Sequence, residues 1–185
     1  AMDLINKKVK DDELKNSKIE ILSYITKLRQ ICLDPSILID DYKGNSSKVD
    51  TLIELLEQSI LGDHKILVFS QFTSVLKNIS SRLEDNSIKH LYLDGSIPSI
   101  KRIDLVNKFN KEDSKEKVFL ISLKAGGTGL NLTSADIVIH FDPWWNPAVE
   151  DQATDRAHRY GQEKIVEVIK LISKNSIEEN IIDCQ

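Results

Sequence analysis

Residues 118–162 decide the fold, and they read VFLISLKAGGTGLNLTSADIVIHFDPWWNPAVEDQATDRAHRYGQ. The stretch contains two apolar segments, 118–123 and 137–141, in which polar residues do not alternate with apolar ones. Segments of this kind are typical of parallel strands that are covered by helices on both faces. A glycine-rich segment separates the two predicted strands, and an aromatic turn and a predicted helix follow the second one.

The rest of the chain repeats this alternation. Further strands are predicted at 66–69, 88–93 and 165–172, and helices at 11–33, 47–59, 73–84, 99–110, from Pro147 and from Ser176. The first helix has an apolar stripe at Leu14, Ile21, Ile25, Leu28 and Ile31. Strands that alternate with helices predict an α/β fold, with a parallel sheet of about five or six strands and helices on both faces. The first helix precedes this unit as an appended N-terminal helix.

Ligands of parallel α/β sheets bind at the carboxyl ends of the strands. Residues 70–71, 94–95, 124–131 and 142–146 all follow predicted strands. We therefore expect the carboxyl edge of the sheet to be the functional face.

Composition limits the possible functions. The chain has 185 residues, of which 41% are hydrophobic and 29% charged, as in globular proteins. It contains no apolar run long enough to span a membrane, no secretory signal, and only two distant cysteines. We therefore expect a cytoplasmic protein with reduced thiols. The formal net charge of -4 argues against a surface dedicated to nucleic acid, so such contacts would need a local patch.

The glycine-rich segment 125–129 allows two interpretations. Glycines after a strand let backbone N–H groups approach a phosphate closely. A tight turn from strand to helix needs the same residues, and this segment taken alone favours the turn. No lysine follows the glycines as in a P-loop, and the spacing of a dinucleotide-binding fingerprint is missing.

The predicted helix from Pro147 carries the strongest candidates. Asn146 is a suitable N-cap, and Gln152, Arg156 and Arg159 follow at i, i+4 and i+7, which places them on one helical face. A solvated face with an Asp155–Arg159 ion pair is one interpretation. A phosphate clamp is the other, because guanidinium groups bind phosphate oxygens in pairs.

Two tryptophans lie between prolines in the turn 142–147. They could close the core, or Trp145 could stack or wedge beside a nucleic-acid groove. The four histidines lack the spacing of metal ligands, and no serine–histidine–aspartate pattern indicates a nucleophile.

Taken together and in order, several motifs resemble a known family. They are LRQICLDP, ILVFSQF, LYLDGS, KAGGTGLNL, DPWWNP and DQATDRAHRYGQ. This series resembles the C-terminal lobe of Swi/Snf-type helicase-like ATPases, which are superfamily-two motors that use ATP to move along double-stranded DNA. The resemblance covers about residues 20–183, and the last motif is highly specific. Asp34 and Tyr160 depart from the family pattern, where histidine and isoleucine are usual.

The resemblance implies roles for individual residues. Arg156 and Arg159 match the arginines that reach the nucleotide phosphates, and are the expected catalytic residues. Gln152, Gly127 and Gly129 match positions that couple ATP to DNA. The residues that match DNA-contacting positions are Ser70, Gln71, Lys124, Thr128, Asn131 and Trp145, of which Trp145 is set against the minor groove.

The chain lacks GxxxxGK[ST] and a strand followed by DExH, which hold nucleotide and Mg²⁺ in the other lobe of such motors. The resemblance therefore implies an N-terminal helical extension, 3–40, and a RecA-like helicase C-terminal lobe, 46–183. It implies one lobe of a DNA-dependent ATPase in the bacterial cytoplasm, associated with the nucleoid. ATP and Mg²⁺ would be held mainly by the N-terminal lobe of the same polypeptide, and the isolated lobe would be inactive. An RNA helicase lobe, which usually lacks the last motif, and an inactive scaffold on the same fold are the alternatives.

Overall fold

The computed structural model describes residues 2–126 and 129–185. Within them, five parallel strands form one sheet in the order β2-β3-β1-β4-β5, which confirms the predicted parallel α/β fold. The strands are β1 Ile66–Ser70, β2 His90–Leu93, β3 Val118–Ser122, β4 Ile137–His140 and β5 Glu167–Lys170. Every residue of β1, β3 and β4 is buried, which explains why their sequences show no polar alternation.

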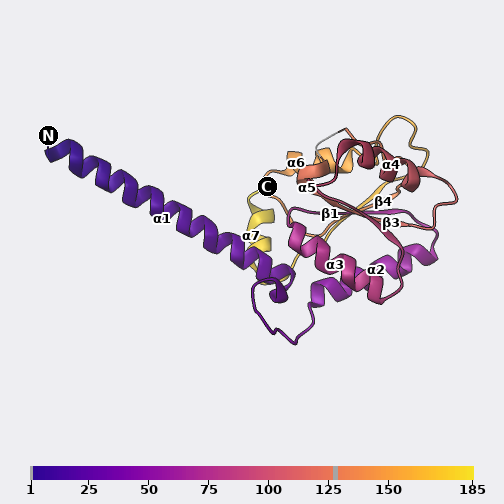
Figure 1. The fold of residues 1–185 in the computed structure, drawn as a ribbon, viewed down its shortest axis with the longest axis horizontal. Coiled ribbons are helices and arrows are strands. Elements are labelled where there is room, and N and C mark those ends of the chain that lie inside the picture. Colours follow the sequence, from indigo (N-terminus) through magenta and orange to yellow (C-terminus); the bar gives the residue numbers. More distant parts are fainter. Residues whose placement is uncertain (1, 127–128) are drawn as a thin grey trace.

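Helices cover both faces of the sheet. They are α1 Met2–Leu33, α2 Ser47–Leu61, α3 Thr73–Asp85, α4 Ser99–Asn110, α5 Leu123–Gly126, α6 Pro147–Thr154 and α7 Ile177–Asp183, with a 3₁₀ turn, η1, at Pro35–Ile37. Figure 1 shows α2 and α3 on one side of the sheet and α4, α5 and α6 on the other.

The core has two halves because successive strand side chains point to opposite faces. Ile66 and Val68 pack with α2 and α3, whereas Leu67 and Phe69 pack with α4 and with the segment around α6. Each fully buried side chain of this size contributes about 1.5–3 kcal/mol through the hydrophobic effect.

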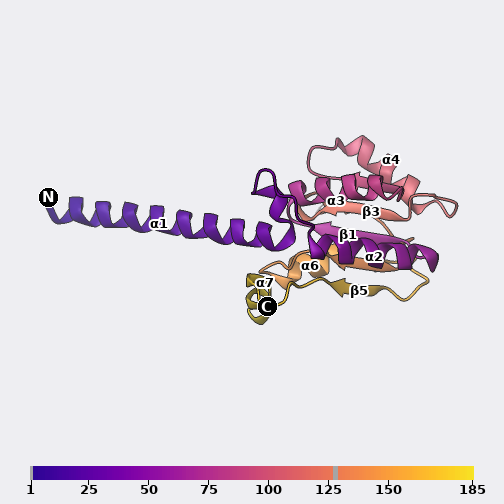
Figure 2. The same ribbon diagram turned by 90° about the horizontal axis from the view of Figure 1, so that it is seen from below.

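The long helix α1 leads away from the sheet in both views (Figures 1 and 2). Its last turns contact the lobe, where Leu33 is fully buried and Arg29 nearly so. Three residues of the predicted apolar stripe, Ile21, Leu28 and Ile31, are exposed and do not pack on this lobe. The helix begins at Met2, earlier than the predicted residue 11.

Further strand boundaries differ from the sequence prediction. The strand predicted at 118–123 ends at Ser122, and Leu123 begins α5. The strands predicted at 88–93 and 165–172 shorten to β2 and β5.

The prediction that one helix carries Gln152, Arg156 and Arg159 on a single face is wrong. Helix α6 ends at Thr154. The following N–H groups of Arg156 and Ala157 bond to carbonyls three residues earlier, at 3.2 and 3.0 Å, which is the pattern of tight turns. Both arginines therefore lie in turns after the helix.

Candidate functional site

The two arginines lie against the end of the glycine-rich segment. The Leu132 N–H donates to the Arg156 carbonyl oxygen at 2.9 Å, and the Arg159 Nη1 donates to the Gly129 carbonyl oxygen at 3.2 Å. Gly129 has a φ of +57°, a left-handed conformation that costs other residues about 1–2 kcal/mol. The structure thus brings Arg156, Arg159 and Gly129 together. We call these three residues the arginine group.

Arg156 is 3% exposed, and among residues 2–126 and 129–185 its Nε has no hydrogen-bond partner. Burial lowers the pKa of Arg156, the neighbouring Arg159 lowers it further, and Asp155 opposes both. No ion pair joins Asp155 to Arg159 in the part of the chain that the structure describes. Two adjacent guanidinium groups, one with a buried unsatisfied donor, favour the binding of an anion.

Gln162 holds this turn in place, although the sequence prediction gave it no role. Its Nε2 donates to the carbonyl oxygens of Thr133, Ala135 and Ala157 at 2.8–3.0 Å. The amide therefore joins the arginine turns to the segment that leads into β4. Gln152, by contrast, is exposed on α6.

The tryptophan turn, residues 142–146, follows β4 at the carboxyl edge of the sheet. Trp144 is half-buried and its N–H donates to Glu150 Oε1 at 2.7 Å, while Trp145 is 42% exposed. Asn146 caps α6, as predicted, by accepting a bond from the Ala148 N–H. The turn is thus fixed at one tryptophan and presents the other to solvent.

Arg29 of α1 reaches into this turn, and the sequence analysis did not identify it as a site residue. Its Nη2 donates to the Pro143 carbonyl oxygen at 2.6 Å, and its Nη1 donates to Gln71 Oε1 at 3.2 Å. The guanidinium also lies over the rings of Trp144 and Trp145, at 5.7 and 5.8 Å from the ring centroids. In the sequence, the one feature that could have indicated a role for Arg29 is its place as a basic residue beside the apolar stripe of the first helix.

Asp142 lies under the same turn and is almost fully buried. Its Oδ2 accepts from the Gln71 N–H at 3.4 Å and lies 3.9 Å from Arg29 Nη2. Burial raises the pKa of Asp142 to about 6, although bonding to Ser70 and the charges of Arg29 and Lys48 oppose the rise. The carboxyl group is therefore held by a polar network that includes two predicted DNA-contacting residues, Ser70 and Gln71.

The remaining predicted site residues differ in burial. Ser70 is fully buried and its Oγ accepts from the Phe72 N–H, whereas Lys124 on α5 and Asn131 are exposed. Gly127 and Thr128 lie outside the described residues. The structure thus places Ser70, Gln71 and Trp145 around Arg29 and Asp142.

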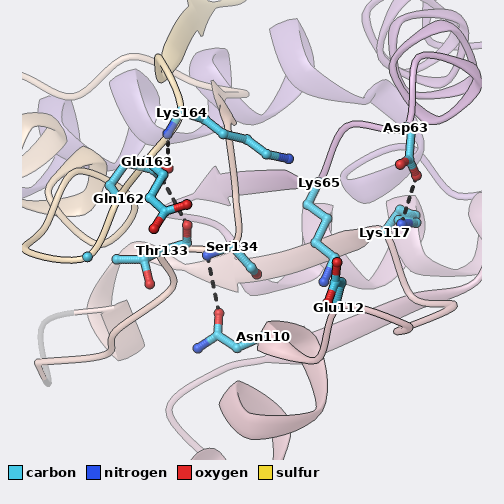
Figure 3. Close-up of a pocket in the computed structure, with 11 residues that line it drawn as sticks. Asp63, Lys65, Asn110, Glu112, Lys117, Thr133, Ser134, Gln162, Glu163 and Lys164 are labelled. Carbon is cyan, nitrogen blue, oxygen red and sulfur yellow. Dashed lines mark hydrogen bonds and ion pairs between the residues drawn. The ribbon is translucent and has the colours of Figure 1, made fainter.

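A hollow of about 310 Å³ lies at the opposite edge of the sheet (Figure 3). The lysines that line the hollow already have hydrogen-bond or ion-pair partners within the protein. The Lys65 Nζ donates to the carbonyl oxygens of Phe109 and Lys111, Lys117 pairs with Asp63, and Lys164 pairs with Asp136. These contacts support the starts of β1, β3 and β4, and we assign the hollow no ligand.

Across residues 2–126 and 129–185, no cluster of histidine, cysteine, aspartate and glutamate could hold a metal ion. No helix in this part of the chain is both long enough and apolar enough to span a bilayer.

Comparison with known proteins agrees with this architecture. Residues 47–161 match the family described as helicase conserved C-terminal domain. The chain is 44% identical over 181 residues to an uncharacterized ATP-dependent helicase of Mycoplasma genitalium, covering 97% of the chain and 17% of that protein. It is 36% identical to the ISWI chromatin-remodeling complex ATPase ISW1 of Saccharomyces cerevisiae, covering 91% of the chain and 16% of that protein.

A solved structure of the C-terminal part of the Fun30 ATPase domain is also similar. It superposes with a TM-score of 0.73 at 43% identity, over 80% of the chain and 48% of that structure. The chain thus spans about a sixth of the length of these curated relatives.

Proposed function

The chain belongs to the family of helicase conserved C-terminal domains, in its Swi/Snf-type branch, and we propose that it is the second motor lobe of an ATP-dependent translocase on double-stranded DNA. In this proposal the lobe supplies two arginines to the nucleotide and part of the grip on DNA. ATP and Mg²⁺ are held mainly by an N-terminal lobe of the same polypeptide.

The arginine group is the observation that carries the proposal. Within the described part of the chain the buried Nε of Arg156 has no hydrogen-bond partner, and Arg159 lies beside it at the Gly129 carbonyl. A phosphate would satisfy that donor and offset the repulsion between the two cations. Arginines placed in this way on a transferring phosphoryl group are worth about 10³–10⁵ in rate, or roughly 4–7 kcal/mol.

The DNA part of the proposal rests on the tryptophan turn and on α5. Trp145 offers an exposed ring between two hydrogen-bonded neighbours, Trp144 and Asn146, which suits a contact with a groove or a base. Lys124 is exposed and suits a phosphate contact. The similarity to an uncharacterized ATP-dependent helicase of Mycoplasma genitalium and a putative ATP-dependent helicase/translocase of Bacillus subtilis supports a bacterial motor. We propose that it acts in the cytoplasm, associated with the nucleoid.

The proposal assigns this chain a supporting part in ATP hydrolysis. The sequence contains no P-loop lysine, and the described residues contain no cluster that could hold Mg²⁺. Mg²⁺, held by the other lobe, would supply charge neutralisation of the nucleotide phosphates. We therefore expect the isolated 185-residue chain to show no ATP turnover above a buffer control.

The decisive test is ATP turnover by the full-length protein, with and without duplex DNA. Arg159→Ala and Arg156→Ala should each lower DNA-stimulated turnover by about 10³-fold or more. Arg82→Ala is the matched control, because Arg82 is a partly exposed arginine on α3 that pairs with Asp50 at 2.7 Å. That variant should keep wild-type turnover.

Wild-type turnover in both arginine variants, with the fold intact by circular dichroism, would reject the proposed arginine fingers. Stimulation by duplex RNA in place of duplex DNA would reject double-stranded DNA as the nucleic acid on which the motor moves, and would favour an RNA motor.

A further inference from the structure

We propose that Arg29 is a positioning residue that fixes the orientation of Trp145 and so connects helix α1 to the proposed DNA contact. This inference rests on the proposed function for its consequence, but its structural part does not depend on DNA. The residue belongs to α1, outside the strand ends from which the predicted contacts come.

Arg29 joins three separate parts of the chain. It lies one turn before the end of α1, and its two terminal nitrogens donate to Gln71, just after β1, and to Pro143, just after β4. These strands are neighbours, with Phe69 paired to His140 in the sheet register. The guanidinium fork therefore bridges the carboxyl ends of two adjacent strands and ties both to α1.

The same group supports the aromatic rings. Its central carbon lies 5.5 Å from the Phe72 ring centroid and at similar distances from the rings of Trp144 and Trp145. Arg29 is only 5% exposed, so these cation–π contacts are formed largely out of water, where they are strongest. The exposed Trp145 thus rests on a buried cation that belongs to another helix.

The shape of the guanidinium matters as well as its charge. Two donors that diverge from one planar group reach Gln71 and Pro143 together, whereas a lysine ammonium is a single point charge on a flexible stem. Arg29→Lys should therefore keep a cation near Asp142 and preserve the fold. It should lose the pair of diverging hydrogen bonds and the planar group that lies over the aromatic rings.

Intrinsic fluorescence tests the positioning directly, because Trp144 and Trp145 are the two tryptophans of the chain. In Arg29→Lys we expect a red-shifted emission maximum and at least a twofold increase in the acrylamide quenching constant, because the rings lose their support. Lys27→Ala is the matched control, since Lys27 is exposed on the same helix and lies over Tyr24. This variant should match the wild type.

Circular dichroism should show the same helix content in all three proteins. Arg29→Gln combined with Asp142→Asn is the second variant, because it removes the fork without leaving a buried unpaired charge. It should show the same red shift. Wild-type emission and quenching in both Arg29 variants would overturn the inference.

The functional consequence is tested in the full-length protein. Arg29→Lys should raise the duplex DNA concentration for half-maximal stimulation by about tenfold, the size expected for one lost stacking contact. Its maximal and DNA-independent turnover should stay within about twofold of wild type, as no guanidinium of the arginine group has changed.

Trp145→Ala separates the two proposals. If Trp145→Ala raises the half-maximal DNA concentration and Arg29→Lys does not, the inference about Arg29 is overturned while the proposed function stands. If Trp145→Ala itself leaves DNA stimulation unchanged, the proposed DNA role of Trp145 is rejected. The fluorescence comparison then still decides whether Arg29 positions the turn.

Discussion

Arg29 and Arg156 are buried to nearly the same extent, yet their hydrogen bonding differs. The guanidinium of Arg29 makes two hydrogen bonds and three ring contacts, whereas the Nε of Arg156 has no hydrogen-bond partner in the residues that the structure describes. A buried donor without a partner costs about 1–3 kcal/mol. That difference fits the two proposals, in which Arg29 holds structure and Arg156 binds a ligand.

Asp142 gives the chain a pH-dependent stability whose sign follows from its raised pKa of about 6. The folded state binds this proton more tightly than the unfolded state, where the pKa is about 3.9. The contribution to the free energy of unfolding is therefore fully present below about pH 4, and is lost as the pH rises through 6. Its full size is roughly 3 kcal/mol.

His140 acts in the opposite direction over an overlapping range. Burial lowers its pKa to about 4, so acidification destabilises the fold through this residue. The Asp142 contribution must therefore be measured as a difference between wild type and Asp142→Asn, by urea unfolding at several pH values. The wild type should gain stability relative to the variant as the pH falls from 7 to 4. A difference that does not vary with pH would contradict the raised pKa.

At the scale of elements, the parallel sheet was predictable and the end of α6 was not. Strands β1, β3 and β4 are uniformly apolar, and a pattern this simple depends only on their burial on both faces. The end of α6 depends on partners distant in sequence. Leu132 bonds to the Arg156 carbonyl and Gln162 to the Ala157 carbonyl. Helical spacing alone could not show that these tertiary contacts replace further helical bonds.

The candidate site was also predictable only in part. The sequence placed Ser70, Gln71 and Trp145 near the sheet edge because they follow strands. It could not place Arg29, because a helix predicted from periodicity carries no information about which residue contacts a turn 114 positions away. The exposure of the apolar residues Ile21, Leu28 and Ile31 on α1 was unpredicted for a similar reason, since periodicity does not show which surface a helix packs against.

Helix α7 is attached to α2 by a buried ion pair, and breaking this pair should lower the free energy of unfolding. The Lys48 Nζ donates to both oxygens of Glu178 at 2.6 and 2.7 Å, and Glu178 also accepts from the Ser173 N–H. Lys48→Met should cost about 3–5 kcal/mol, because it leaves a buried carboxylate without its cation.

Lys48→Met combined with Glu178→Gln should recover most of that loss in urea unfolding, because no buried charge remains. Arg82→Ala is the control, as it breaks the partly exposed pair with Asp50 and should cost less than about 1 kcal/mol. Equal losses in the buried and exposed single variants would contradict this account.

At the scale of the whole molecule, the charge balance predicts how binding to DNA responds to salt. The net charge is -4, and among the residues proposed to contact DNA only Lys124 is a cation. Each neutralised phosphate contributes about -0.9 to the slope of log K against log salt concentration. With one such cation we expect a slope of about -1 for this chain and duplex DNA, measured by tryptophan fluorescence.

Lys124→Ala should make this slope less negative by about 1, whereas Lys115→Ala in the loop before β3 should not change it. A wild-type slope steeper than about -4 would reveal a basic surface other than the one proposed.

The long α1 extends well beyond its anchor at Arg29. At 1.5 Å per residue, Met2 lies about 40 Å from Arg29 along the helix axis. The Trp145 ring centroid lies 5.8 Å from the guanidinium carbon of the same anchor. If α1 is a rigid rod, a displacement of about 3.5 Å at Met2 corresponds to a change in helix direction of only about 5°. The contacts of Arg29 with the tryptophan turn would therefore make that turn sensitive to the direction in which α1 leaves the lobe.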